Sequence, residues 1–195
     1  EYFTGIYSSD LGSEFDEAFD YGCFGLFSLG YNFKENLELD DALVRLDYVK
    51  QQEDTANPSK QPDHKNITSL VTKFEKDNLH LWADLSFSDG YGSQSDLFGL
   101  QFMPFYDITD KTQAVFSYTY IKSSGGDGIK LTKYEKDLFS GKGNETSESF
   151  LGLNHFFYGH KLKWQNGIQY TEMETTSAGD KYDGWGFTSG IRISW

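Results

Sequence analysis

The closing stretch of the chain, Tyr182–Trp195, alternates between two kinds of side chain. Its large apolar positions are Trp185, Phe187, Ile191, Ile193 and Trp195, with the polar Ser189 among them, and its small or polar positions are Gly186, Thr188, Gly190, Arg192 and Ser194. A period of two defines an extended strand, because successive side chains of a strand point to opposite sides of the backbone. An apolar alternation that ends on an aromatic residue favours the closing strand of a transmembrane β-barrel over a buried strand of a soluble β protein.

The same alternation recurs along the whole chain and predicts about ten strands and no helix. We expect these strands at residues 2–8, 23–33, 42–50, 66–74, 79–88, 96–105, 112–121, 148–157, 161–171 and 182–195. The connections alternate in length: the long ones are 9–21, 51–65, 89–95, 122–147 and 172–181, and the short ones are 34–41, 75–78, 106–111 and 158–160. Outer-membrane barrels have long loops outside the cell and short turns in the periplasm, and a soluble Greek key has no reason for such a rhythm. The prediction is therefore an all-β, antiparallel, up-and-down transmembrane β-barrel, with residues 1–195 as a single barrel region.

Composition agrees with this class of protein. Mean hydropathy is −0.58, and no apolar run is long enough for a membrane helix. Barrel strands present only every second residue to lipid, so a low mean hydropathy is compatible with a membrane barrel. A net charge of −13 argues against binding of nucleic acid. No signal peptide is visible at the start of this sequence.

Several segments resemble one family of outer-membrane channels. They are YFTGIYSSD, DALVRLDYV, QSDLFGLQFMPFYDITDKTQAVFSYTYI, FLGLNHFFYGHKLKWQNGIQYTEM and YDGWGFTSGIRISW. Together they make the chain similar to the phosphate-selective porin O/P type. The resemblance implies a trimeric, sixteen-stranded barrel in the outer membrane of a Gram-negative bacterium, with this chain as its C-terminal part and about six N-terminal strands outside this sequence. The alternative is a complete ten-stranded barrel.

Alternation also assigns one face of the strands to the lumen. This face comprises Arg45, Asp47, His80, Trp82, Asp84, Gln113, Ser117, Thr119, Asn154, Lys161, Lys163, Gln165, Gln169 and Arg192. Lys161, Lys163 and Arg192 belong to the last two expected strands, where they could form a basic wall that attracts anions. The alternative is that these residues are ordinary wetted side chains, with Arg45 and Asp47 in a routine ion pair. Resemblance to barrel proteins in general implies that Trp195 is a signal for the barrel-assembly machinery.

The expected function is passive diffusion of small hydrophilic solutes or ions, including anions such as phosphate. Members of the resembled family select anions with basic lumen residues that include a ladder of arginines, whereas this chain has only Arg45 and Arg192. The resemblance therefore supports a porin more strongly than phosphate selectivity. The expected partners are outer-membrane lipid and lipopolysaccharide, two further copies in a homotrimer, the assembly machinery and small anions or solutes. We expect no nucleic acid.

The sequence also bears on two other classes of function, an enzyme and a structural barrel. An outer-membrane enzyme is not expected, because the four histidines have no metal-ligand spacing and no nucleophile or phosphate-binding motif occurs; we likewise expect no cofactor and no metal. A structural or adhesion-related barrel with a plugged lumen is the alternative, because the loop at 122–147 is long enough to fold inwards. The acidic stretch from Asp10 to Asp20 is expected in an outer loop. It is either simply solvated, or it binds divalent cations that bridge lipopolysaccharide, or it repels anions at the mouth.

Overall fold

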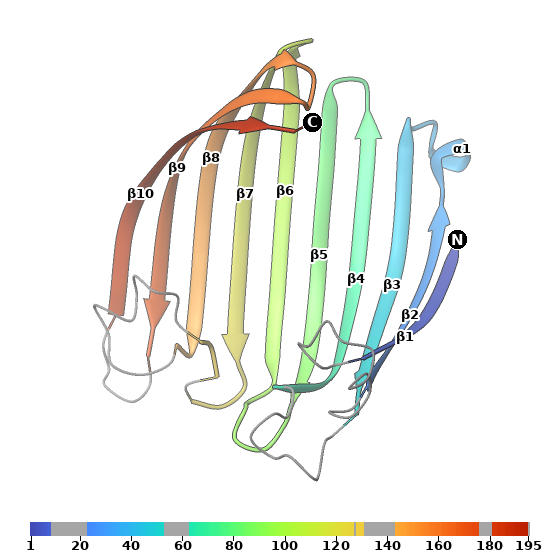
Figure 1. Ribbon diagram of the computed structural model, residues 1–195, viewed down its shortest axis with the longest axis vertical. Coiled ribbons are helices and arrows are strands. Elements are labelled where there is room, and N and C mark those ends of the chain that lie inside the picture. Colours follow the sequence, from blue (N-terminus) through green and yellow to red (C-terminus); the bar gives the residue numbers. More distant parts are fainter. Residues whose placement is uncertain (9–22, 53–62, 127, 131–142, 176–180, 195) are drawn as a thin grey trace.

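The computed structural model describes residues 1–8, 23–52, 63–126, 128–130, 143–175 and 181–194. These residues form one antiparallel sheet of ten strands, in which each strand pairs with its neighbours in the sequence (Figure 1). The strands are β1 (Tyr2–Ser8), β2 (Cys23–Asn32), β3 (Asp41–Gln51), β4 (His64–Lys76), β5 (Leu79–Gly90), β6 (Leu97–Thr109), β7 (Thr112–Ser123), β8 (Glu145–Tyr158), β9 (Leu162–Glu174) and β10 (Lys181–Ile193). The predicted all-β, up-and-down arrangement is confirmed.

Several connections and strand ends differ from the prediction, and the open edges of the sheet bear on its alternative, a complete ten-stranded barrel. A helix of a single turn, α1 (Lys34–Leu37), occupies the connection between β2 and β3, where no helix was expected. Strand β9 begins at Leu162, so Lys161 lies in the turn. Strand β8 begins at Glu145, so the connection that precedes it is shorter than predicted. Finally, β1 and β10 are the two edges of the described sheet and do not pair with each other, so the described residues do not form a closed ten-stranded barrel.

The short connections use backbone conformations that suit tight turns, and they gather at the upper end of the sheet in Figure 1. Gly159, between β8 and β9, has a φ of 50°, which glycine adopts without steric cost. Asp77, between β4 and β5, has a φ of 52°, and its N–H donates a hydrogen bond of 2.7 Å to Oδ2 of Asp40. This hydrogen bond joins the β4–β5 turn to the β2–β3 connection, so two neighbouring turns are held side by side.

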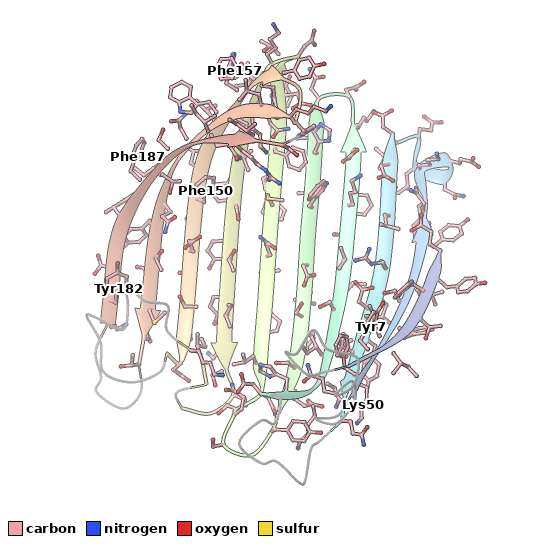
Figure 2. The ribbon with its side chains drawn as sticks, viewed as in Figure 1. Tyr7, Lys50, Phe150, Phe157, Tyr182 and Phe187 are labelled. Atoms are coloured by element: carbon pink, nitrogen blue, oxygen red, sulfur yellow. The ribbon has the colours of Figure 1, made fainter. Side chains whose placement is uncertain are left out.

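The sheet is curved, and its convex face carries most of the exposed large apolar side chains. Phe187, Trp185 and Leu151 are 76%, 73% and 57% exposed. The register places Phe187 opposite Ile168, and Ile168 opposite Leu151, so the apolar set continues across three strands. In Figure 2, Phe187 lies at the outer side of the sheet, and Phe150 lies further in, on the opposite, concave face. Among the described residues, the only buried apolar side chains are Ala42, Ile129 and Met173.

Such a distribution inverts the usual pattern of a water-soluble protein, in which large apolar groups are buried and extended apolar patches are rare. The stability of the described sheet therefore rests on backbone pairing and on whatever covers the convex face.

Glycines on the concave face of β8 and β9 make room for an aromatic ring. A Cβ added to Gly167 would lie 2.2 Å from the ring of Phe150, and one added to Gly152 would lie 2.6 Å from it. Phe150 therefore lies flat across two glycines on adjacent strands, and its ring covers backbone that would otherwise be bare.

This contact makes a testable prediction about stability. We expect Gly167→Ala to displace the Phe150 ring and to lower stability by about 1–3 kcal/mol, the usual cost of overpacking. The matched control is Gly190→Ala, because a Cβ there meets nothing within 4 Å. Thermal unfolding of both variants in the same detergent measures the difference, and equal midpoints would contradict the contact.

Candidate pore wall

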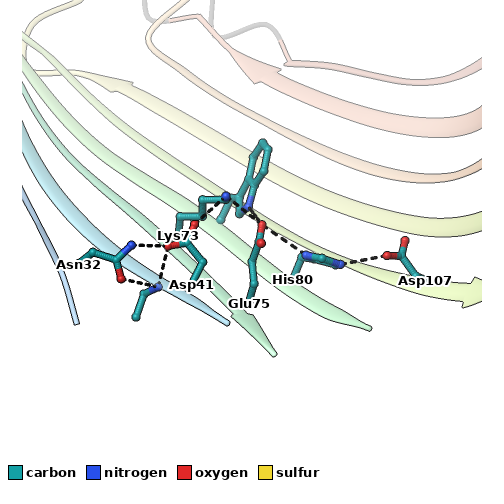
Figure 3. Close-up of polar contacts among 8 residues, drawn as sticks. Asn32, Asp41, Lys73, Glu75, His80 and Asp107 are labelled. Carbon is teal, nitrogen blue, oxygen red and sulfur yellow. Dashed lines mark hydrogen bonds and ion pairs between the residues drawn. The ribbon is translucent and has the colours of Figure 1, made fainter. Parts of the chain in front are cut away.

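The concave face carries a chain of polar side chains at the ends of the strands that meet the short turns (Figure 3). It begins at Asn32, whose Nδ2 donates a 2.5 Å hydrogen bond to Oδ1 of Asp41. Nζ of Lys73 then lies 2.8 Å from Oδ2 of Asp41 and 3.2 Å from Oε1 of Glu75. The ring of His80 follows, with Nδ1 3.4 Å from Glu75 and Nε2 3.0 Å from Oδ2 of Asp107. These contacts link β2 to β6.

Side-chain amides continue the same chain from β6 to β9. Gln113 donates a hydrogen bond of 2.8 Å to Oδ1 of Asp107. Asn154 donates one of 3.0 Å to Gln113, and Gln165 donates one of 2.9 Å to Asn154. The register explains the order, because Gln113 lies opposite both Asp107 and Asn154, and Asn154 lies opposite Gln165. We call the whole set, Asn32, Asp41, Lys73, Glu75, His80, Asp107, Gln113, Asn154 and Gln165, the polar belt.

The acidic part of the polar belt has more carboxylates than lysines. Asp41, Glu75 and Asp107 are its three carboxylates, and Lys73 is its single lysine. These groups are part-buried, where charge–charge contacts are screened less than at an open surface. The belt therefore gives this side of the concave face a negative potential.

Two basic side chains on the last strands form the opposite kind of wall. Arg192 lies directly opposite Lys163 in the register of β10 and β9. Within the described part of the chain, neither contacts a carboxylate, whereas Arg45, Lys73 and Lys122 each form an ion pair. Nζ of Lys163 instead lies 5.9 Å from the ring centroid of Phe156. Like charges directly opposite each other are destabilising, so this pair favours an anion beside it.

Lys161, the third residue of the predicted basic wall, lies outside the strands. It lies in the exposed turn between β8 and β9, where its carbonyl accepts a 2.8 Å hydrogen bond from the N–H of Ser194. Because β9 begins one residue later than predicted, the paired strands contain Lys163 and Arg192 but not Lys161.

The other predicted lumen residues also lie on the concave face. Arg45 is paired with Asp47 at 2.8 Å, the routine ion pair that was the alternative interpretation. Asp84 lies opposite Val71 and Gln101 and accepts a hydrogen bond from Ser86. The register also places Ser117, Thr119 and Gln169 on this face. Trp195 and the acidic stretch Asp10–Asp20 lie outside the described residues.

Five residues of the polar belt were not predicted as site residues: Asn32, Asp41, Lys73, Glu75 and Asp107. Asn32, Lys73 and Asp107 each lie an even number of residues from the lumen-facing positions of the same strand. The alternation that assigns the lumen face therefore includes them if it is continued to the strand ends. Asp41, Glu75 and Asp107 had been assigned to short connections, because the apolar alternation fades there. The sequence signal that could have found these residues is therefore a polar residue at the end of an alternating segment.

The ends of β8, β9 and β10 curl over the sheet, so that β10 faces β4, β5 and β6 across a cavity of about 750 Å³. One wall presents Glu75, His80 and Asp107 from the polar belt. The opposite wall presents Arg192, together with Thr188 and Gly190 of β10. Trp82, Phe105 and Phe150 supply aromatic rings to the same cavity.

Comparison with known proteins finds no matching family model, no matching curated protein and no matching solved structure. Within the described residues, no helix has both the length and the apolar character needed to cross a membrane. In the same part of the chain, no group of three or more His, Cys, Asp and Glu side chains is arranged to hold a metal ion.

Proposed function

We propose that this chain is the pore-forming region of an outer-membrane porin, through which small hydrophilic solutes or ions diffuse passively. The observation that carries the proposal is the opposition of the two faces of one sheet: exposed aromatic and aliphatic side chains on the convex face, and a hydrogen-bonded polar belt on the concave face. A sheet with an apolar outside and a polar inside is the arrangement that transmembrane barrels require.

The edges of the sheet support a larger barrel. β1 and β10 each present one side of their backbone without a partner strand in the described sheet, and unpaired N–H and C=O groups are costly within a membrane. Further strands that join these two edges would complete the ring. By the resemblance stated above, we propose a sixteen-stranded barrel that forms a homotrimer in a bacterial outer membrane, in contact with lipid and lipopolysaccharide and inserted by the barrel-assembly machinery.

The proposed mechanism is electrostatic and geometric. A solute passes along the concave wall between the acidic part of the polar belt and the Lys163–Arg192 pair, and the charge of each wall decides which ions accumulate there. The basic pair supports permeation of anions, with phosphate as one candidate. The proposal involves no catalysis, no cofactor and no nucleic acid.

A second candidate function is a structural or adhesion-related barrel with a plugged lumen. One observation favours it. Between β7 and β8, Ile129 bridges Gly143, and a Cβ on Gly143 would lie 3.1 Å from the sulfur of Met173 on the concave face. Gln94 also donates a 2.7 Å hydrogen bond to the carbonyl of Gly128. These contacts hold part of the connection over the concave face, where a longer inward segment would narrow or close a pore.

Planar bilayer recording separates the two candidates. We expect the purified full-length protein, with the further strands that join β1 to β10, to produce stepwise conductance, because a polar concave wall in a closed ring supports a water-filled path. The reversal potential under a KCl gradient then gives the preferred ion. Preference for chloride supports the basic pair as the selecting element, and preference for potassium assigns that role to the carboxylates. Insertion without any conductance would overturn the porin proposal and favour the plugged barrel.

A further inference from the structure

The cavity between β10 and β4–β6 combines three features that a channel for inorganic ions does not need together. Its walls carry opposite charge, with Glu75 and Asp107 on one side and Arg192 on the other. Its lining is largely apolar because Trp82, Phe105 and Phe150 contribute rings. Its volume of about 750 Å³ is in the range of pockets that enclose small organic molecules.

The negative wall is fixed in position by its neighbours. Glu75 contacts Lys73, His80 and the indole Nε1 of Trp82, which lies 3.4 Å from Oε1. Asp107 accepts from Gln113 and lies against His80. Because Lys73 is also shared with Asp41, the carboxylates retain excess negative charge, which favours an ammonium group on this side of the cavity.

The positive wall has an unused binding capacity. Arg192 has no carboxylate within ion-pair distance among the described residues, and the neighbouring Lys163 repels it. A guanidinium group offers a fork of N–H donors that matches a carboxylate in two parallel hydrogen bonds. The preferred ligand of this wall is therefore a carboxylate.

The aromatic rings select the body of the ligand. Trp82 is 40% exposed although it lies on the polar face. Its ring meets Phe105 edge to face at 5.1 Å, and His80 stacks on Phe105 at 4.5 Å. A rigid apolar surface of this kind, adjoined by Phe150 in the same cavity, accommodates an aromatic or large apolar side chain.

We infer that this cavity binds zwitterionic solutes with an apolar body, the chemical class of the aromatic amino acids. The carboxylate would face Arg192, the ammonium group would face Glu75 and Asp107, and the side chain would contact Trp82, Phe105 and Phe150. As a solute site in the channel wall, it rests on the proposed porin function. An inorganic anion would use Arg192 alone, and a neutral sugar would leave both charged walls without a partner.

The test is calorimetric titration of the full chain in detergent micelles with L-phenylalanine, phenylacetate, phenethylamine and L-alanine. We expect phenylalanine to bind most tightly, because each of the other three lacks the ammonium group, the carboxylate or the ring. We expect Arg192→Ala to weaken phenylalanine binding about tenfold or more, the usual effect of losing a hydrogen bond to a charged group. Trp82→Ala should weaken it while leaving the weaker binding of alanine unchanged.

Two variants on the convex face serve as matched controls. Lys76→Ala removes an exposed positive charge, and Trp185→Ala removes an exposed indole, in both cases away from the cavity. Neither should alter the affinity for phenylalanine, and circular dichroism confirms that all variants keep their strand content.

Each outcome decides one proposal. Equal affinity for phenylalanine, phenylacetate and alanine, or unchanged binding in both Arg192→Ala and Trp82→Ala, would overturn the zwitterion site. Conductance without such binding overturns only this inference. Binding of phenylalanine without channel conductance would support the zwitterion site and overturn the porin proposal.

Discussion

Phe187→Arg is expected to prevent stable insertion of this chain into a lipid bilayer, whereas Thr188→Arg is expected to permit it. The two positions are adjacent in β10 but belong to opposite faces. Phe187 is 76% exposed on the convex face, opposite Ile168. Thr188 lies opposite Gly167 and lines the concave cavity. Arginine on the lipid face of a barrel costs about 2–4 kcal/mol near the bilayer centre, and arginine on the lumen face avoids that cost.

The measurement is folding into preformed lipid vesicles, followed by protection from protease and by the mobility of the unboiled protein in a gel. Thr188→Arg is the matched control, because the introduced residue, the strand and the depth are the same within one position. If Phe187→Arg folds into vesicles as efficiently as Thr188→Arg, the convex face does not contact lipid and the membrane assignment fails. Failure of both variants would point instead to disruption of β10 pairing.

Reversing the charge of the Lys163–Arg192 pair should produce the second large effect. In Lys163→Glu/Arg192→Glu, two unpaired cations become carboxylates that face a wall already rich in Asp41, Glu75 and Asp107. Charged channel walls change the local concentration of ions by roughly tenfold or more. We therefore expect the anion-to-cation permeability ratio to fall by about tenfold or more.

Reversal potentials under a KCl gradient measure this ratio, and high salt should reduce the effect because it screens the wall charges. The control is Lys50→Glu/Lys76→Glu, which makes the same change in net charge at two exposed residues of the opposite face. A similar shift in both double variants would mean that net charge governs selectivity. If the permeability ratio shifts in neither double variant, the Lys163–Arg192 pair lies outside the permeation path.

Alternation in the sequence predicts which face each residue takes, but it does not predict which residues meet. Asp84, Gln165 and Arg192 lie on the concave face as expected, because a strand leaves only two choices for a side chain. The polar belt depends in addition on the register between strands that follow one another in the chain. Register is set by the hydrophobic pattern and by turn geometry. The sequence therefore did not show that Asp107, two residues beyond a predicted strand end, lies opposite Gln113.

Helix α1 and the packing of Phe150 could not be predicted from the alternation of apolar and polar residues. Helix α1 has only four residues, too few to be stable by propensity, and it exists because the flanking strands hold its ends. The packing of the Phe150 ring over Gly152 and Gly167 depends on which side chains neighbouring strands bring together. The sequence shows the glycines, but it does not show which ring covers them.

The pairing of each strand only with its neighbours in sequence has a consequence for how the sheet assembles. Every strand pair is formed by adding one strand to a neighbour already in place, so the loop closed at each step is short compared with the chain and its entropic cost is low. Growth can begin at any of the tight turns and spread in both directions. A lesion that stops β6 from pairing would therefore divide the chain into two sheets that nucleate separately, each with a newly exposed edge that invites aggregation.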